Sequence, residues 1–596
     1  MCGIFGIVMT REQTLGPILI EAGRRLSYRG YDSVGCATLH DDGTIDLRKD
    51  VGKVGEVAER LGFSEMVGRR GIVQLRWATF GTPSQVNAQP HLDSDGDLVG
   101  AHNGNVVNNV ELRQQFIAEG ITVRSTNDGE SCVHAVERYV DRGCGMVEAI
   151  RHAYDDLEGD YAFIIGRVGE DELYAIKKGS GLVVGLGEGF TCCSSDLPSV
   201  LPLTRRILRV HDGEIVLMCA DRVEVRRVSD GGLVVREVEL CTEDMDVAEK
   251  GGYPHFMLKE IHEQPEVAGD LLHLLAASSH VAPMVEAMRR ARHLYFVGCG
   301  TSYHACLLGA VYAARLARRP AVPILAPQFI AQYGPALAPD DVALFVSQSG
   351  ETKDVLNALE VAEARGVVPL GLVNVLGSTL MYRSRHYLPL ACGYEISVPA
   401  TKTFVNQVIA FLYLALKMGE RPAAVLDPLP NLLQQVLEEV GPQVERVLPA
   451  FHRRDDLYQL GYGLTYGIAL EGALKLKEIT YAHCEGMLST EFKHGPLSAV
   501  SEGYPVLFVV GPEDVGLLVS AINEVTCRGG LAIVVAEEDA RLRANAHDLI
   551  VLPNSGPLLM PILATLPLQL LSYRMSVARG YDPDFPRNLS KTLTVD

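Results

Sequence analysis

An internal repeat in the second half of the chain constrains the fold more than any other feature. The segment 298–303, Gly-Cys-Gly-Thr-Ser-Tyr, follows a short apolar run, and so does the segment 461–466, Gly-Tyr-Gly-Leu-Thr-Tyr. After each segment, apolar runs alternate with helical patterns, which is typical of a mainly parallel sheet with helices on both faces. The repeat therefore predicts two doubly wound α/β modules of one kind.

The apolar runs give the expected elements of both modules. In the first module we expect a closing helix at 404–417 and strands at 294–298, 342–347, 370–375 and 387–391. In the second we expect a closing helix at 560–578 and strands at 457–461, 506–510, 531–536 and 549–552. A proline-rich stretch, 421–430, is interpreted as the linker between them.

The first part of the chain has a different pattern. It is mostly β, with helices at 16–25 and 127–140 and strands at 4–8, 71–77, 98–103, 161–166 and 172–176, which predicts stacked sheets. An acidic segment after Cys241 marks its end. The 596 residues are then divided into 2–240, a connecting segment 241–287, modules 288–428 and 450–586, and a tail 587–596.

Cys2 is the first candidate for chemistry. Once Met1 is removed, which a small second residue permits, Cys2 carries a thiol and a free α-amine. The ordinary pKa of that amine is about 7.7–8.0, so it is a suitable base for the thiol near neutral pH. The alternative is a buried cysteine in a first strand, and Cys2 taken alone does not decide between the two.

Hydroxyl side chains follow two strands of the first module. The positions are Thr301 and Ser302 after one strand, and Ser347, Gln348, Ser349 and Thr352 around the turn after the next. Ligands of parallel sheets bind at the carboxyl ends of strands, and helix N-termini with hydroxyl groups bind phosphate. The matching segment of the second module, 511–514, lacks the hydroxyls, so we expect the first module to hold the ligand. Simple helix capping is the alternative.

Other candidate groups lie on a helix and in two turns. A predicted helix carries charged residues at spacing i, i+4 and i+7, which is also the spacing of a solvated ion-pair ladder: Glu471, Lys475 and Glu478. His494 lies in a predicted loop, where it is able to transfer protons near neutral pH. Asn103 and Gly104 end a strand, where they form either an oxyanion hole or an ordinary turn.

The charge and the cysteines exclude several classes of protein. The net charge of −20 at pH 7 argues against binding of nucleic acid or of anionic membranes. The 13 cysteines include no CxxC and no Cys/His pair at zinc spacing, so we expect no metal, and reduced thiols in the cytoplasm. We expect no signal peptide, and the apolar run 408–416 is too short to cross a membrane.

Together these motifs resemble the glutamine–fructose-6-phosphate aminotransferase (isomerising) family. The resemblance extends from Cys2 to the last residue and includes the segments 2–4, 28–33, 76–79, 102–104, 298–303, 347–352, 469–478, 493–496 and 586–589. It implies an N-terminal-nucleophile amidotransferase domain of αββα type, followed by two sugar-isomerase (SIS) domains. It also implies conversion of L-glutamine and D-fructose 6-phosphate to L-glutamate and D-glucosamine 6-phosphate without a cofactor. Ammonia would pass through an internal channel gated by Trp77.

The resemblance implies roles for the amidotransferase residues. Cys2 would attack the glutamine carboxamide, with its own amine as the base. Asn103 and Gly104 would stabilise the oxyanion. Arg76 and Asp128 would hold the carboxylate and the amino group of glutamine, a charge-matched pair suited to an amino acid.

It implies roles in the isomerase half as well. The sugar phosphate would be bound by Thr301, Ser302, Ser347, Gln348, Ser349 and Thr352. Glu478 would move the proton between C1 and C2, and Lys591 would engage the open-chain ketose carbonyl. His494 would assist ring opening from the neighbouring subunit, which implies a homodimer.

Several positions depart from the family pattern, including the segment 486–490. Phe80 and Gln89 stand where the family usually has histidine in the amidotransferase. Gln328, Pro399 and Ser590 are atypical and are expected near the sugar or the domain interface. These residues leave a different keto-sugar phosphate open as the substrate.

Two alternatives come from other classes of protein. A sugar-phosphate-sensing regulatory protein with a vestigial amidase would need the phosphate contacts but not the acid–base residues, and those residues are retained. A pyridoxal-phosphate transaminase would need a reactive lysine. Lys402 is the one candidate for that lysine, and no motif supports it.

Overall fold

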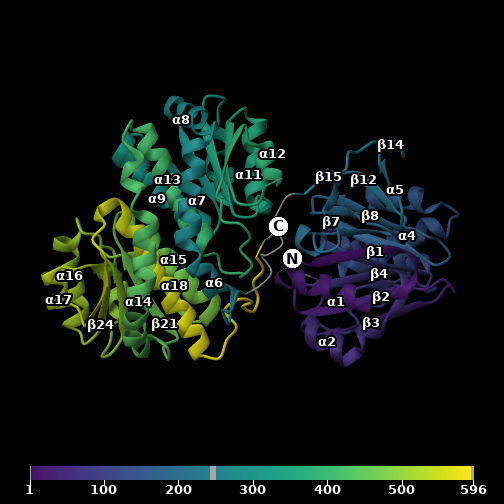
Figure 1. Cartoon of the computed structure of the whole chain (residues 1–596), viewed down its shortest axis with the longest axis horizontal. Helices are drawn as coiled ribbons and strands as arrows, with labels where there is room; N and C mark the ends of the chain where they lie inside the picture. Colours follow the sequence, from purple (N-terminus) through teal and green to yellow (C-terminus); the bar gives the residue numbers. More distant parts are fainter. Residues whose placement is uncertain (1, 79, 242–249, 377, 592–596) are drawn as a thin grey trace. The chain divides into compact units, whose positions relative to one another are not determined.

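The computed structural model describes residues 2–78, 80–241, 250–376 and 378–591. They form two compact units, Met1–Glu249 with Ser590–Asp596, and Lys250–Leu589. Figure 1 shows the elements of each unit, which are described here one unit at a time.

The first unit contains two antiparallel sheets. One has the order β15-β11-β9-β10-β1-β4-β2-β3, and its strands are β1 (Gly3–Thr14), β2 (Ser33–Leu39), β3 (Ile45–Val51), β4 (Val67–Arg76), β9 (Val183–Leu186), β10 (Phe190–Ser194), β11 (Arg206–Arg209) and β15 (Glu239–Leu240). The other has the order β14-β13-β12-β8-β7-β6-β5, and its strands are β5 (His91–Leu92), β6 (Leu98–Val106), β7 (Gly159–Arg167), β8 (Leu173–Lys178), β12 (Glu214–Met218), β13 (Val223–Arg227) and β14 (Leu233–Val234).

Helices cover the outer face of each sheet. Side chains alternate along β1, so Phe5 and Ile7 pack toward α1 (Gly16–Arg25) and α2 (Val54–Leu61), while Ile4 and Val8 pack between the sheets. The second sheet packs against three helices, α3 (Asn109–Glu119), α4 (Asp128–Val140) and α5 (Met146–Asp156). This four-layer order confirms the predicted αββα fold.

The second unit begins with connecting helices and the first parallel sheet. Its strand order is β17-β16-β18-β19-β20, formed by β16 (Leu294–Gly298), β17 (Val322–Leu325), β18 (Val342–Ser347), β19 (Val368–Val373) and β20 (His386–Pro389). The helices of this part are α6 (Phe256–His262), α7 (Gln264–Ala277), α8 (Val281–Arg290), α9 (Thr301–Ala317), α10 (Ala326–Tyr333), α11 (Lys353–Ala364), α12 (Thr379–Arg383) and α13 (Lys402–Met418). Leu294 and Phe296 face α9 and α13, and Tyr295 and Val297 face α10 and α11, so both sheet faces are covered.

The second parallel sheet repeats this arrangement. Its order is β22-β21-β23-β24-β25, formed by β21 (Asp456–Gly461), β22 (His483–Leu488), β23 (Pro505–Val509), β24 (Leu531–Glu537) and β25 (Asp548–Leu552). The helices are α14 (Leu429–Phe451), α15 (Leu464–Thr480), α16 (Val515–Thr526), α17 (Ala540–Asn545) and α18 (Gly556–Ala578). The two doubly wound sheets confirm the predicted repeat. The edge strands β17 and β22 were not predicted from the sequence.

One hydrophobic core joins the two modules. It contains buried residues of α9 and α13 from the first module together with α14, α15 and α18 from the second, and α15 packs against both α9 and α18 (Figure 1). Helix α18 is long and apolar enough to cross a membrane, but 83% of its most apolar window is buried in this core. It is therefore a core helix of the unit.

Candidate functional site

The Cys2 thiol is buried, and Cys2 directly precedes β1. The Trp77 backbone N–H donates a hydrogen bond to Cys2 Sγ at 3.2 Å, and the thiol lies 3.4 Å from the Trp77 carbonyl oxygen. Arg29 Nε donates to the Cys2 carbonyl oxygen at 3.2 Å, which fixes the backbone of the residue. Burial raises the pKa of the thiol, and the Trp77 N–H partly opposes that shift. The thiol therefore needs a nearby base to react near neutral pH.

Arg76 is the last residue of β4 and lies beside Cys2. Its guanidinium has N–H groups that make no hydrogen bond to the described residues. Its guanidinium is fully buried, and Nη2 donates to the carbonyl oxygens of Phe80 and, at 2.7 Å, of Gly81. Arg76 Nε and Nη1 have no hydrogen-bond partner among the described residues. A buried guanidinium with free donors is costly unless an anion completes it, and a carboxylate has the matching geometry.

Asn103 and Gly104 lie next to each other on β6. The Asn103 side chain is buried, and neither Oδ1 nor Nδ2 has a partner among the described residues. Gly104 adopts φ +109°, a backbone conformation that favours glycine. The pair offers a free amide donor and a backbone N–H, the components of an oxyanion hole.

Gly104→Ala is expected to destabilise the protein by about 2 kcal/mol or more, because the positive φ alone costs roughly 1–2 kcal/mol. In addition, an added Cβ would lie 2.1 Å from the Asp160 carbonyl oxygen. Gly120→Ala is the matched control, because Gly120 has φ +91° and open space around the Cβ position. Thermal unfolding should show a clearly larger loss for Gly104→Ala. Equal losses would contradict the predicted clash.

Asp128, the first residue of α4, is buried and ionised. Its Oδ2 accepts the Val106 N–H at 3.1 Å and lies 3.3 Å from His102 Nε2. Burial opposes ionisation, but His102 keeps the pKa of Asp128 below its usual range. Gln89 positions His102 through two contacts. Gln89 Oε1 accepts the backbone N–H of His102 at 2.7 Å, and Gln89 Nε2 lies 3.2 Å from the ring nitrogen Nδ1 of His102. Gln89 thus occupies its atypical position with a complete set of hydrogen bonds.

In the second unit, the hydroxyl loop after β18 forms a tight turn. Ser347 Oγ lies 3.0 Å from Thr352 Oγ1 and accepts the Gly350 N–H at 3.0 Å. Ser349 Oγ accepts the Glu351 N–H at 3.2 Å. The Gln348 carbonyl oxygen accepts two N–H groups from residues 374 and 375, after β19. Because β16 pairs with β18, this turn lies beside the loop that begins α9, at the carboxyl edge of the sheet, where the strand order changes direction.

Helix α15 of the second module brings charged groups to α9 of the first. Thr301 Oγ1 donates to Glu471 Oε1 at 3.0 Å and accepts from Lys475 Nζ at 3.3 Å. Lys475 Nζ lies 2.6 Å from Glu478 Oε2, and His304 Nδ1 lies 2.8 Å from Glu471 Oε2. Burial opposes the charge of Lys475, but Glu471 and Glu478 raise the pKa of its ammonium group. The result is a largely buried, charged acid–base cluster next to the predicted phosphate loops.

Only part of this cluster was predicted from the sequence. The spacing of Glu471, Lys475 and Glu478 is equally compatible with an exposed ladder, and His304 is not among the predicted site residues. A usable signal was present, because nearly all the other residues of α15 are small or apolar, which indicates a helix buried on most sides. Ser302, predicted to bind phosphate, is buried and accepts a hydrogen bond from Gln407 Nε2 at 3.0 Å.

The structure does not bring every predicted residue together. His494 is exposed at the end of a short 3-10 helix, Phe492–His494, and no hydrogen bond or ion pair joins its side chain to the described phosphate loops. Lys591 is grouped with the first unit, and Trp77 packs edge-on against Tyr31 with ring centroids 5.9 Å apart. Thr79, within the 76–79 motif, lies outside the described residues. The roles of His494, Lys591 and Trp77 stay predictions.

Lys402 is a structural residue in this arrangement. It is buried, and its Nζ lies 2.6 Å from Glu263 Oε2. Burial opposes the charge, but Glu263 raises the pKa of Lys402. A lysine held in its charged form by an ion pair is poorly suited to form a Schiff base.

Comparison with known proteins agrees with this geometry. A family model described as "Glutamine amidotransferase domain" matches residues 75–184, and one described as "SIS domain" matches 287–417 and 450–579. The C-terminal domain of glucosamine-fructose-6-phosphate aminotransferase from Francisella tularensis, a solved structure, is 31% identical with a TM-score of 0.52, covering 57% of this chain and 100% of its own. Fold and site together define a glutamine amidotransferase joined to a pair of SIS domains.

Full-length relatives narrow the class further. Glutamine–fructose-6-phosphate aminotransferase (isomerizing) of Methanothermobacter thermautotrophicus is 40% identical over 606 residues, and that of Pyrobaculum aerophilum is 39% identical over 607 residues. Each alignment covers 100% of this chain and 100% of the relative. The chain belongs to the glutamine–fructose-6-phosphate aminotransferase (isomerizing) family.

Proposed function

We propose that this chain converts L-glutamine and D-fructose 6-phosphate into L-glutamate and D-glucosamine 6-phosphate. The observation that carries the proposal is the buried thiol of Cys2 beside Arg76, whose Nε and Nη1 have no partner among the described residues. A thiol nucleophile next to a guanidinium with free donors suits an amide substrate that also carries a carboxylate. Full-length membership of the family supplies the identity of the amide and of the sugar.

In the amidotransferase unit, the Cys2 sulfur attacks the carboxamide carbon of glutamine. The α-amine of Cys2, free once Met1 is removed, takes the thiol proton and passes it to the leaving nitrogen, so that ammonia departs and a thioester remains. Asn103 Nδ2 and the Gly104 N–H donate to the oxyanion of each tetrahedral intermediate. Water then hydrolyses the thioester to glutamate. Arg76 binds the substrate carboxylate, and Asp128 binds its α-ammonium group.

In the SIS unit, Thr301 and Ser302 bind the sugar phosphate together with Ser347, Gln348, Ser349 and Thr352. Ammonia adds to the C2 carbonyl of the open-chain ketose and water leaves, after which Glu478 moves a proton from C1 to C2 to give the aldose. The ion pair with Lys475 favours the carboxylate form of Glu478, which is the form that accepts a proton. Ammonia and acid–base groups suffice for these steps, so the proposal requires no metal or redox cofactor.

The proposal extends to the assembly. His494 assists ring opening from a second copy of the chain, which requires a homodimer, and Lys591 engages the ketose carbonyl. Ammonia passes from Cys2 to the sugar through an internal channel gated by Trp77. The enzyme acts in the cytoplasm, where the cysteines, which form no disulfide among the described residues, stay reduced.

The test supplies glutamine with a panel of ketose phosphates and identifies the amino sugar by mass spectrometry and NMR. We expect glucosamine 6-phosphate from fructose 6-phosphate at the rate of glutamate release. Another amino sugar would show that the atypical residues Gln328, Pro399 and Ser590 mark a change of substrate. No amino sugar from any ketose would overturn the proposal in favour of a sugar-phosphate sensor.

A further inference from the structure

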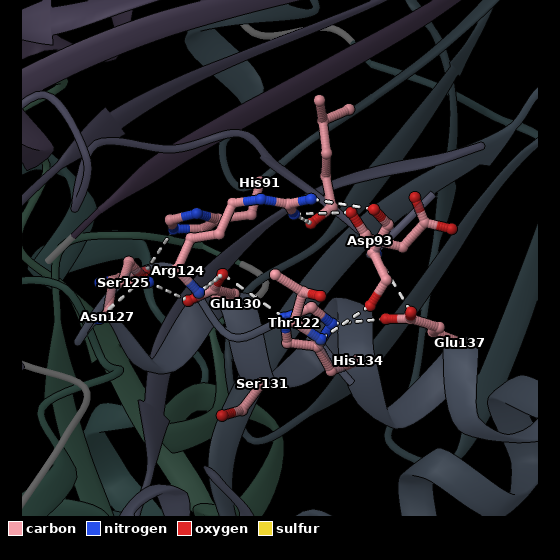
Figure 2. A network of polar contacts seen from close by, with 12 residues as sticks. His91, Asp93, Thr122, Arg124, Ser125, Asn127, Glu130, Ser131, His134 and Glu137 are labelled. Atoms are coloured by element: carbon pink, nitrogen blue, oxygen red, sulfur yellow. Dashed lines mark hydrogen bonds and ion pairs between the residues drawn. The ribbon is translucent and has the colours of Figure 1, made fainter. Parts of the chain in front are cut away.

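A buried histidine on α4 lies between two carboxylates (Figure 2). His134 Nε2 lies 3.4 Å from Glu130 Oε1, and His134 Nδ1 lies 2.5 Å from Glu137 Oε2. The three side chains are 0 to 4% exposed. The mechanism proposed above uses none of them.

The carboxylates use their remaining capacity to hold two loops. Glu130 accepts the Arg124 N–H at 2.7 Å and the Ser125 N–H at 2.6 Å. On the other side, Glu137 Oε1 accepts the Ser94 N–H at 3.0 Å. The triad of Glu130, His134 and Glu137 therefore ties both loops to the body of α4.

From the triad, hydrogen bonds continue to Asp128. Ser125 Oγ accepts the Asn127 N–H at 3.1 Å, and Asn127 Oδ1 caps α4 by accepting the Gly129 N–H at 2.9 Å. Asn127 Nδ2 donates to Asp128 Oδ1 at 3.3 Å. A continuous chain of contacts thus joins His134 to Asp128 through Glu130, Ser125 and Asn127.

The geometry favours a charged imidazole. A neutral histidine has a single ring N–H, so one of the two buried carboxylates would face a nitrogen lone pair. Burial opposes the charge, but the carboxylates of Glu130 and Glu137 raise the pKa of His134 above its ordinary value. The other surroundings of the triad include the Phe116 ring and the charged or titratable groups of Lys49, His91, Asp93, Arg124 and Asp141.

We propose that His134, clamped between Glu130 and Glu137, is a positioning residue that aligns Asp128 with the α-ammonium group of glutamine. The inference rests on the proposed function, in which Asp128 binds that group. It predicts that the triad controls recognition of the amino group and leaves the chemistry at Cys2 unchanged.

The test compares glutamine with glutaramic acid, which is glutamine without its α-amino group. The measured quantity is the preference for glutamine, which is kcat/KM for glutamine divided by kcat/KM for glutaramic acid. In His134→Gln this ratio is expected to fall about tenfold, the effect of losing one charge-assisted hydrogen bond, while kcat/KM for glutaramic acid stays unchanged. His152→Gln is the matched control, because His152 is exposed on the neighbouring helix α5, and we expect its preference to equal that of the wild type. Glu137→Gln, which keeps an oxygen for the Ser94 N–H, is expected to lower the preference about threefold.

The outcomes separate the two proposals. If the wild type does not hydrolyse glutamine, the proposed function fails. If the wild type does, and His134→Gln keeps its preference for glutamine, the positioning role is wrong. Equal losses on glutamine and glutaramic acid would also overturn it, because a general loosening of the unit affects both substrates. If His134→Gln does not fold, Glu137→Gln decides the question by the same comparison.

The wild-type preference should also depend on pH. Because the pKa of His134 is raised in the folded protein, the imidazolium contributes fully below pH 6.5, and its contribution is lost as the pH rises through the raised value. The ratio of the two kcat/KM values should therefore fall toward alkaline pH in the wild type more steeply than in His134→Gln. If the ratio falls equally steeply with pH in the wild type and in His134→Gln, the charge of the His134 imidazolium has no role in the preference.

Discussion

Cys2→Ala is expected to lower glutamine hydrolysis by about 10⁴- to 10⁶-fold, because no other group replaces the nucleophile. Binding of fructose 6-phosphate should be unchanged, since the predicted phosphate loops belong to the other unit. Glutamate release in a coupled assay measures the first effect, and isothermal titration calorimetry measures the second.

Cys527→Ala is the control for loss of a thiol, because Cys527 is exposed on the SIS unit. It should leave glutamine hydrolysis at the wild-type rate. Glutamate release by Cys2→Ala at that rate would show that the nucleophile is wrongly assigned. Loss of sugar binding in Cys2→Ala would instead indicate that the substitution disturbs the whole fold.

Lys475→Met is expected to abolish conversion of the sugar and to destabilise the SIS unit by about 3–5 kcal/mol, the usual cost of removing one partner from a buried ion pair. Methionine fills the space, but the buried Glu471 and the half-buried Glu478 then lack their shared cation. Uptake of a proton by one of them relieves the repulsion, and a protonated Glu478 is no longer a base. Thermal unfolding and the rate of amino sugar formation measure the two effects.

Lys477→Met is the matched control, since Lys477 is exposed two residues further along α15. It should change neither stability nor rate appreciably. The double variant Lys475→Met/Glu478→Gln should recover part of the stability but none of the activity. A Lys475→Met protein that is active at the wild-type rate would contradict the acid–base cluster.

Much of the fold was predictable because its hydrophobic patterns are local. The strands at 294–298 and 342–347 occur where predicted, as continuous apolar runs ending in small residues. The long helix α14 was not predicted, and the proline-rich stretch 421–430, interpreted as a linker, overlaps its first turn; Pro442 and Pro449 lie inside the helix. Prolines in the first turn fit a helix, and the interior ones are tolerated here because the core packs against the rest of α14.

Parts of the candidate site could be predicted from the sequence where the type of a single residue indicates its chemical role. Cys2, Arg76, Asn103 and Asp128 are side chains whose types match glutamine, and all four are buried in one unit. The approach of His304 to Glu471 was not predictable, since these residues are 167 positions apart in the sequence and meet only because α9 packs against α15. A contact between side chains of two different modules leaves no local pattern in the sequence.

The shared core of the two SIS modules has a consequence for how this chain is able to evolve. After a duplication, one copy is normally free to drift or to be deleted. Here the first copy has the hydroxyl loop, while the second lacks it at the matching segment 511–514 and supplies Glu471, Lys475 and Glu478. Neither copy is redundant, so deletion of either module would remove part of the candidate site and would expose the apolar core that the two modules share.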